Sequence, residues 1–407
     1  MHDLEHTSRR ITATLFTAQS LSSAAVIAMA TIMSIVATQL YGDASQAGLP
    51  YAVNNLSAAP AAFLWGVLWD RLGRRLGLTL GLVVGVFGAV LTVVAVQTGS
   101  FLLFLVGMAG LGVTRAAVGL GRFIASEVSP PERRGRAISY VVLGGTVGAI
   151  LGPLLVSPSS KWVMAFGLDE LAGPFAVSIV LFAIVAVVTY WGLNPEPMEV
   201  SKKVDEQFPQ TDQPAGDSRT IRQLIRLPAV WVAVLAMALP QMVMVMVMGM
   251  TSLHMREHNH ALDAISLVFS AHTLGMFAFS IVSGRLSDRW GRGQVILVGT
   301  VILLVSFTLA PMRTTTSMLA FALFLLGLGW NFCFVAGSAL LADQLYPPER
   351  ARTQGFNDVF IGLATAGGSY GSGLLLAAWG YSVLNQVSAA VILFPLILTT
   401  WWLLKHN

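Results

Sequence analysis

Methionine is concentrated in one apolar stretch of the sequence, in a pattern that suits binding of a soft metal ion. Residues 237–250 hold six of the sixteen methionines in the chain. Residues four apart share one face of a helix, so Met244 and Met248 form one stripe, and a second stripe begins at Met242. Thioethers are neutral, soft ligands that select Cu(I) over harder ions. One stripe is therefore a candidate copper site, and the other suits packing.

The next apolar stretch contributes His272 and, four residues later, Met276. An imidazole has few structural reasons to lie in a small, apolar membrane segment. At about 1.5 Å per residue, Met244 lies roughly 9 Å and His272 roughly 13 Å from the outer ends of their expected helices. We therefore expect Met244 and His272 to be the principal ligands, with Met248 and Met276 on the entry and exit sides. The alternative is that methionine serves here as flexible core filler.

A short polar segment after the methionine run carries further soft or imidazole ligands. They are His254, Met255, His258 and His260. This group is a candidate for metal capture at the mouth of the path, although loop histidines are usually plain solvated residues. The single cysteine, Cys333, cannot form an intrachain disulfide, so thiol chemistry is minimal or absent.

Two other polar residues stand inside apolar stretches. A charge such as Arg115 is costly in mid-membrane, so Arg115 faces a cavity or an ionic partner, for which Glu127 is one candidate. Gln241 lies beside the methionines, where its amide suits the polar groups of an organic substrate. Both residues are predicted to be buried polar groups.

The composition requires a membrane around these residues. Of 407 residues, 55% are hydrophobic and only 11% are charged, too few charges to cover a water-soluble surface. This excludes a soluble enzyme, a secreted disulfide scaffold and a disordered protein. The formal charge of +4 does not indicate nucleic acid, because in a membrane protein the placement of basic residues matters.

Twelve apolar stretches are long enough to cross a bilayer. They cover residues 11–38, 48–69, 76–97, 100–124, 137–157, 172–193, 228–250, 263–284, 293–312, 316–341, 355–376 and 383–404. The proline-rich, polar residues 194–227 predict a solvated linker, with a surface helix at its basic end. We therefore expect an all-α membrane protein with six-helix bundles at 1–193 and 228–407.

Basic residues fix the expected orientation. Nearly all Lys and Arg fall on the termini, the linker and the loops of one side, which the positive-inside rule makes cytoplasmic. We expect a retained first helix without a cleaved signal peptide and both termini in the cytoplasm.

A loop motif recurs after the second and eighth helices. It comprises Gly66, Asp70, Arg71, Gly73, Arg74 and Arg75 in the first half, and Asp288 and Arg289 in the second. The glycines allow a tight turn, and each carboxylate can accept backbone N–H groups at a helix terminus. Pro-Pro-Glu-Arg also recurs, at residues 130–133 and 347–350. Two parallel six-helix repeats are typical of transporters with a substrate site near the midplane.

These motifs resemble the major facilitator superfamily over nearly the whole chain. The resemblance implies two pseudo-symmetric six-helix bundles, alternating access, and a gating role for the loop motif. Gly148, Gly152 and Pro153 resemble part of an element of superfamily antiporters, although close helix packing explains the glycines equally well.

A second resemblance concerns the cargo. Met244 with Met248 and His272 with Met276 match the two elements of the CcoA-type copper importers. This resemblance implies import of copper, expected as Cu(I), across the bacterial inner membrane for cytochrome oxidase assembly. Copper is then the substrate, and no cofactor is expected. The other expected partner is the lipid bilayer, and the protein is expected to be a monomer.

Three other functions remain open from the sequence. Related riboflavin importers lack the Met and His motifs, so a riboflavin-like molecule is the main alternative, and a drug/proton antiporter is another. A metal sensor that keeps the fold without moving cargo is the third. An enzyme is not expected, because no Ser/His/Asp, P-loop or dinucleotide constellation is evident.

Overall fold

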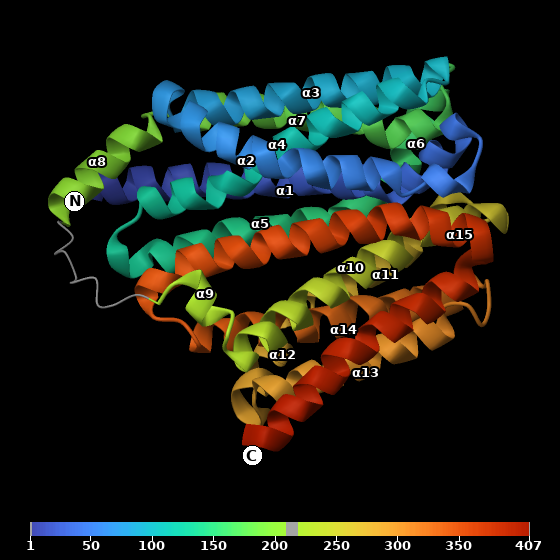
Figure 1. Cartoon of the computed structure of the whole chain (residues 1–407). Helices are drawn as coiled ribbons and strands as arrows, with labels where there is room; N and C mark the ends of the chain where they lie inside the picture. The colour runs from blue at the N-terminus through green and yellow to red at the C-terminus, as the bar shows by residue number, and fades with distance from the viewer. Residues whose placement is uncertain (1, 209–218, 407) are drawn as a thin grey trace. The chain divides into compact units, whose positions relative to one another are not determined.

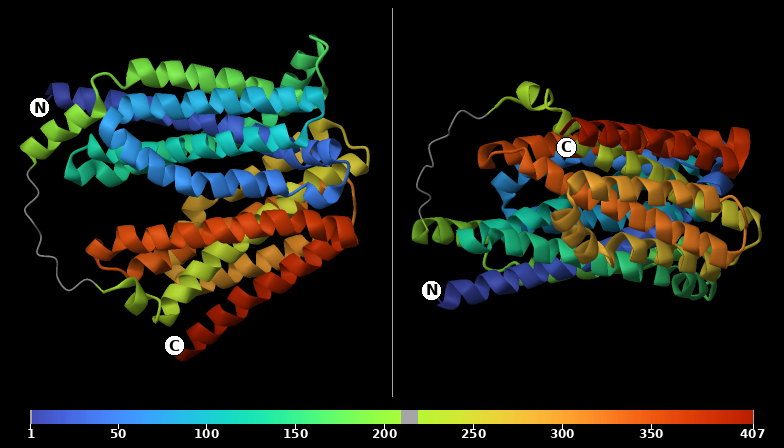
Figure 2. Two further views of the ribbon diagram at one scale, coloured as in Figure 1. Left: turned by 45° about the horizontal axis from the view of Figure 1, so that its top comes forward. Right: turned by 90° about the horizontal axis from the view of Figure 1, so that it is seen from below.

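The computed structural model describes residues 2–208 and 219–406, and these residues contain helices and no strands (Figure 1). They belong to two compact units. Unit 1 comprises Met1–Val36 and Val53–Gln213, and unit 2 comprises Ala37–Ala52 and Pro214–Asn407. In the left view of Figure 2, the long helices of each unit lie side by side as a bundle.

The helices of the first half are α1 (His2–Tyr41), α2 (Leu49–Leu72), α3 (Arg74–Thr98), α4 (Phe101–Glu127), α5 (Arg134–Leu154), α6 (Val156–Met164), α7 (Gly173–Gly192) and α8 (Pro197–Gln207), with short turns η1 (Ala44–Gln46), η2 (Pro131–Arg133) and η3 (Glu170–Ala172). Those of the second half are α9 (Ile221–Leu224), α10 (Pro228–Glu257), α11 (Leu262–Phe277), α12 (Ser280–Trp290), α13 (Arg292–Leu309), α14 (Thr316–Asp343) and α15 (Pro347–His406). The main packing partners are α3 with α4 and α7 in unit 1, and α10 with α15 and α14 with α10, α11 and α13 in unit 2.

The prediction of an all-helical membrane fold is confirmed. Ten helical segments of the described residues are long and apolar enough to cross a bilayer. The last of them contains two helices, because α15 breaks at Gly380, whose φ of 76° lies in the left-handed region. With α2, roughly 36 Å long at 1.5 Å per residue, the described helices of spanning length reach the expected twelve.

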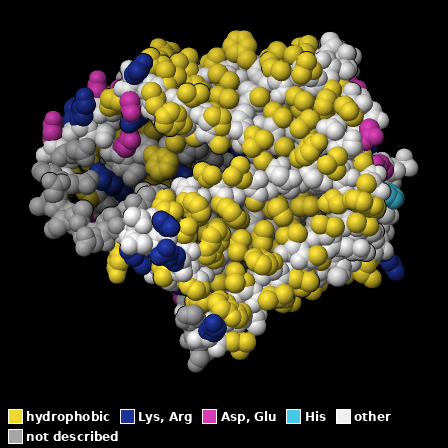
Figure 3. All heavy atoms as spheres, in the orientation of Figure 1, with side chains coloured by type: hydrophobic (Ala, Val, Ile, Leu, Met, Phe, Trp, Pro, Cys, Tyr) yellow, Lys and Arg dark blue, Asp and Glu magenta, His cyan; other side chains and the backbone are white. Residues whose placement is uncertain are grey.

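Hydrophobic side chains cover most of the helical surface visible in Figure 3, and most charged side chains lie toward the helix ends. This distribution is what contact with hydrocarbon requires, because an apolar side chain loses nothing by facing lipid and a charged one loses its hydration.

Some boundaries differ from those expected from the sequence. Residues 2–10, expected as a tail before the first helix, are the first turns of α1. The linker contains a full helix, α8, which buries Val200 and Val204. The expected basic surface helix is reduced to the single turn α9. Residues 209–218, with Pro209 and Pro214 of the predicted linker, lie outside the described residues.

Small residues bring α1 and α5 into close contact. A Cβ atom at Gly148 would lie 1.9 Å from the Ser20 carbonyl oxygen, and one at Gly144 would lie 2.5 Å from that of Phe16. Gly152 continues the series one turn later, with a Cβ position 2.8 Å from the Ala24 oxygen. Residues four apart share a face, so this glycine stripe lets the two backbones touch. Packing therefore accounts for the glycines of the antiporter-like element.

A buried ion pair joins Arg219, just before α9, to Glu349 in the first turn of α15. The Glu349 side chain is fully buried and accepts hydrogen bonds from Arg219 Nη2 at 2.7 Å and Nε at 2.9 Å, and from the Arg219 backbone N–H at 2.8 Å. Arg219 Nη2 also donates to the Gln344 carbonyl, and the guanidinium lies 4.7 Å from the centre of the Tyr346 ring. The Arg219 guanidinium holds the pKa of Glu349 down at about 2, and Glu349 raises the pKa of Arg219.

Candidate functional site

The methionines of α10 are mostly core residues of unit 2. Met244 and Met246 are each 4% exposed, while Met242 and Met248 are half-buried. A Cβ atom at Gly368 of α15 would lie 2.4 Å from Met242 Cγ and 3.2 Å from Met246 Cγ. The second stripe therefore packs against α15, and Met244 with Met248 faces another direction.

The sulfur of Met237, near the start of the methionine run, accepts hydrogen bonds. The Ser338 hydroxyl donates to Sδ at 3.2 Å, and the Asn357 amide donates to it at 3.8 Å. Since Met237 is also 1% exposed, its lone pairs are already used within the core.

His272 is fully buried on α11, at the contact with α14. This contact is close because Gly327 places its backbone against His272: a Cβ atom there would lie 2.2 Å from the His272 carbonyl oxygen. The Leu323 carbonyl can only accept, so Nδ1 of His272, at 2.9 Å, is the donor. In the neutral imidazole, Nε2 then carries a lone pair, and among the described residues Nε2 has no hydrogen-bond partner.

The described contacts do not join Met244 to His272. Helix α10 packs mainly on α14 and α15, and α11 packs mainly on α14, whereas α10 and α11 touch little. Met276 is half-buried, and its carbonyl accepts a 2.7 Å hydrogen bond from Asn331 of α14. The four-residue copper set therefore stays a prediction.

The polar segment after the methionine run lies partly within α10, which contains His254 and Met255, and its side chains contact different neighbours. The ring of His254 stacks on Tyr381, with centroids 4.2 Å apart, and lies 4.4 Å from the His258 ring. His260 places Nε2 at 2.7 Å from the Thr314 carbonyl and Nδ1 at 3.1 Å from the Thr316 hydroxyl, and Met255 is fully buried. The described residues contain no group of three or more His, Cys, Asp or Glu side chains arranged to hold a metal ion.

An aromatic cluster in unit 2 was not anticipated from the sequence. Trp330 and Phe334 of α14 stack with centroids 4.9 Å apart, and Phe277 of α11 meets Trp330 edge-on at 6.4 Å. Trp330 Nε1 donates to Gln241 Oε1 of α10 at 2.7 Å. Gln241 is half-buried rather than buried, and its amide N–H groups are left to donate elsewhere. The available signal was the Trp330 and Phe334 pair, four residues apart on one helix face.

The repeated loop motif forms a similar charge cluster in each unit. In unit 1, Arg74 binds Asp70 at 2.8 Å and Glu127 at 3.1 Å. In unit 2, Arg292 binds Asp288 and, at 3.1 Å, Asp343. Glu127 at the end of α4 and Asp343 at the end of α14 thus complete the two clusters, and the loop motif in the sequence predicted neither acid as a member.

Glycines in the left-handed region make the turns of this motif. Gly73 has φ 86° and Gly291 has φ 102°. In unit 1 the acid that accepts backbone N–H groups at a helix start is Glu196, 2.6 Å from Arg74 N and 3.2 Å from Arg75 N. Asp70 binds the Arg74 side chain instead.

Of the remaining motif residues, Arg71, Arg289 and Gly66 lie at the surface or in open space, and Arg75 is half-buried. Arg71 and Arg289 are exposed, and a Cβ atom at Gly66 would meet nothing within 4 Å. The guanidinium of Arg75 lies over the Tyr190 ring, 4.3 Å from its centre.

Arg115 is half-buried and donates to the side-chain oxygen of Asn55 on α2 at 2.9 Å. Glu127, one candidate for an ionic partner of Arg115, is not that partner. Both residues lie on α4, about 18 Å apart along the axis at 1.5 Å per residue, and Glu127 instead binds Arg74. Asn55 and Arg115 thus form a polar pair inside unit 1.

Relatives of the chain are membrane transporters. It is 32% identical over 387 residues to YdeG of Bacillus subtilis, an uncharacterised MFS-type transporter, covering 94% of this chain and 89% of the relative. It is 30% identical over 398 residues to the riboflavin transporter RfnT of Brucella anthropi, covering 96% of both chains.

Solved structures share the fold at low sequence identity. A bacterial homologue of the human lysosomal transporter Spinster, in an inward-facing and unoccupied conformation, matches with TM-score 0.73 and 16% identity over 98% of this chain and 96% of that one. A point mutant of the nucleoside transporter NupG matches with TM-score 0.74 and 16% identity, over 96% of this chain and 99% of that one. The family model of the Major Facilitator Superfamily matches residues 15–261 and 241–407. The chain therefore belongs to the major facilitator superfamily.

Proposed function

We propose that this secondary transporter carries a small, planar, heteroaromatic molecule of the riboflavin type. The observation that carries the proposal is the cluster of Trp330, Phe334 and Phe277 beside the Gln241 amide. A relative of matching length, 30% identical to this chain, is named a riboflavin transporter, which supports the same substrate class.

The chemistry of the cluster suits such a substrate. Offset or edge-on ring contacts contribute about 0.5–1.5 kcal/mol each beyond the burial of area, so a flat ring system gains from both Trp330 and Phe277. The Gln241 amide supplies both a donor and an acceptor for ring nitrogens and carbonyls. Apolar walls with a few placed polar groups are the usual form of a small-molecule site.

The test is riboflavin uptake in bacterial cells that can neither make nor import it. We expect accumulation with the wild type, a large loss with Trp330→Ala, and partial retention with Trp330→Phe. The matched control is Trp401→Ala, which removes a 42% exposed tryptophan from α15. Absence of riboflavin uptake by wild-type protein of normal membrane abundance would refute this substrate.

Copper import is the second candidate, favoured by the buried Nε2 of His272. A metal-bound histidine commonly donates its other ring N–H to a carbonyl, as Nδ1 of His272 does to Leu323. Met276 on the same helix, with Met244 and Met248 of α10, would supply thioethers that favour Cu(I). In this case the protein imports copper across the bacterial inner membrane, with both termini cytoplasmic, and supplies oxidase assembly.

Copper import is tested by accumulation of radioactive copper in cells without their own importer. We expect loss with His272→Ala and with Met244→Ala, but not with Met242→Leu, which preserves a core contact to Gly368. Uptake into sealed vesicles separates transport from binding by a sensor. Equal copper uptake by wild type and His272→Ala would exclude this site.

A further inference from the structure

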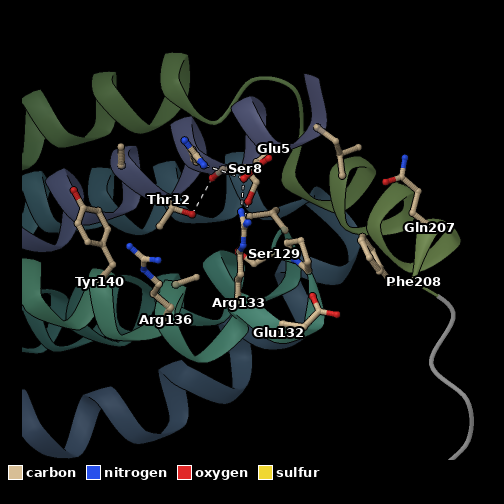
Figure 4. A pocket seen from close by; sticks show the side chains of 16 residues that line it. Glu5, Ser8, Thr12, Ser129, Glu132, Arg133, Arg136, Tyr140, Gln207 and Phe208 are labelled. Carbon is tan, nitrogen blue, oxygen red and sulfur yellow. Dashed lines mark hydrogen bonds and ion pairs between the residues drawn. The ribbon is translucent and has the colours of Figure 1, made fainter. Parts of the chain in front are cut away.

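A cavity of about 690 Å³ lies in unit 1, between the first turns of α1, the η2 turn and the start of α5, with the end of α8 beside it. Figure 4 shows its lining side chains directed into the space from these segments. Neither the loop motif nor the proposed substrate site uses any of them. Its volume lies within the range of roughly 300–1,000 Å³ typical of small-molecule sites.

The cavity lies where the glycine stripe of α5 ends, because α5 packs tightly on α1 only along the glycines. Gly144, Gly148 and Gly152 bring α5 against α1. The two preceding positions on the same face are Tyr140 and Arg136, four and eight residues before Gly144. Their large side chains prevent the close approach that the glycines allow, and both line the cavity.

The described lining residues include three arginines and two glutamates, so the lining carries one net positive charge. Glu5 is bound by Arg9 at 2.9 Å and also by Arg133, so its carboxylate is already neutralised. Glu132 and Arg136 are both exposed, but Glu132 lies at the η2 end of the row of side chains, away from Tyr140 (Figure 4). Arg136 is directed into the cavity near Thr12 and Tyr140, and its guanidinium supplies up to five N–H donors.

Hydroxyl and apolar groups complete the lining. Thr12 and Ser8, one turn apart on α1, and Ser129 present hydroxyls. The Tyr140 ring stacks on Phe16, with centroids 4.7 Å apart, which orients its phenol. Apolar side chains surround these groups, including Leu4, Val128 and Phe208. An anion attached to an organic group fits a wall of this kind better than a bare ion does.

We infer that this cavity binds a phosphate ester, held by Arg136 and the Tyr140 hydroxyl, with its organic part against the apolar wall. Arginine forms bidentate, charge-assisted hydrogen bonds with phosphate, which gives both strength and orientation. Two sources share this chemistry: the headgroup of an anionic phospholipid, and a soluble organic phosphate.

The experiment measures binding to the purified full-length chain by two probes. The first is phosphatidylglycerol, counted by native mass spectrometry after transfer from mixed micelles. The second is glycerol 3-phosphate, detected by thermal stabilisation. The variants are Arg136→Gln, Tyr140→Phe, which keeps the stack on Phe16, and the control Lys203→Gln, which removes an exposed charge of α8 outside the cavity.

Loss of at least one charge-assisted hydrogen bond predicts about tenfold weaker binding for Arg136→Gln, a smaller loss for Tyr140→Phe, and no change for Lys203→Gln. Binding of phosphatidylglycerol alone with this pattern identifies a lipid site, and binding of glycerol 3-phosphate, alone or with the lipid, a phosphate-ester site open to soluble ligands. Equal effects of Arg136→Gln and Lys203→Gln, or no binding of either probe, overturn the inference. Unliganded melting temperatures establish that each variant is folded.

Discussion

Removal of Arg219 should destabilise unit 2 far more than removal of any exposed arginine nearby. In the substitution Arg219→Ala, the hydrogen-bond donors that the described residues still offer the Glu349 carboxylate are two backbone N–H groups, of residue 219 and Tyr346. The Glu349 side chain is 0% exposed, so water does not replace the guanidinium without rearrangement. The substitution therefore leaves a buried charge without its counter-charge.

The size of the effect follows from the burial of the two partners. Breaking a fully buried ion pair from one side costs about 3–5 kcal/mol. The side chain of Arg219 is 31% exposed, which lets water reach part of the site, so we expect about 2–4 kcal/mol. For a unit of this size, 1 kcal/mol corresponds to about 2–4 °C, so the melting temperature should fall by roughly 4–16 °C.

The assay is thermal unfolding of the purified protein, followed by tryptophan fluorescence, for Arg219→Ala, Glu349→Ala and the double variant. If the pair acts as a unit, the double variant should be more stable than the sum of the single losses indicates, with a coupling energy of about 1–3 kcal/mol. Arg222→Ala, an exposed arginine one turn away on α9, is the control. Single effects that add to within about 0.5 kcal/mol would refute the reasoning.

Three further predictions concern pH and backbone contacts. The pKa of Glu349 falls from 4.5 in the unfolded chain to about 2 in the folded protein, so the stabilisation by its carboxylate is complete above pH 4.5 and is lost as the pH falls toward 2. The difference in unfolding free energy between wild type and Arg219→Ala should therefore be large at pH 7 and small at pH 3. A difference that stays constant with pH would contradict this prediction. Gly148→Leu should separate α1 from α5 and lower the melting temperature or abolish folding, because the Cβ atom of the new side chain would already lie 1.9 Å from the Ser20 carbonyl oxygen. The control Gly135→Ala places its Cβ atom in open space and should leave the melting temperature unchanged. Gly380→Ala should cost about 1–2 kcal/mol, because φ is 76° there; an unchanged unfolding free energy would show that the break in α15 tolerates a side chain.

Local sequence patterns determine the elements of this protein. Each apolar run predicts a helix because a backbone in hydrocarbon must satisfy its own hydrogen bonds, whatever its neighbours are. The two tight turns follow from Gly73 and Gly291 themselves. Both residues have positive φ angles, which glycine adopts without steric cost. The recurrence of the loop motif predicts two related halves, and that prediction needs no contact between helices.

Tertiary structure decides which side chains meet. Arg115 binds Asn55 rather than Glu127, and Arg219 binds Glu349, 130 residues away. The cluster around Trp330 takes its members from α10, α11 and α14, so no single stretch of sequence contains it. A helix repeats its side-chain directions along its own axis, but its rotation and its neighbours depend on packing over its whole length, and that packing selects the partners of each polar or aromatic group.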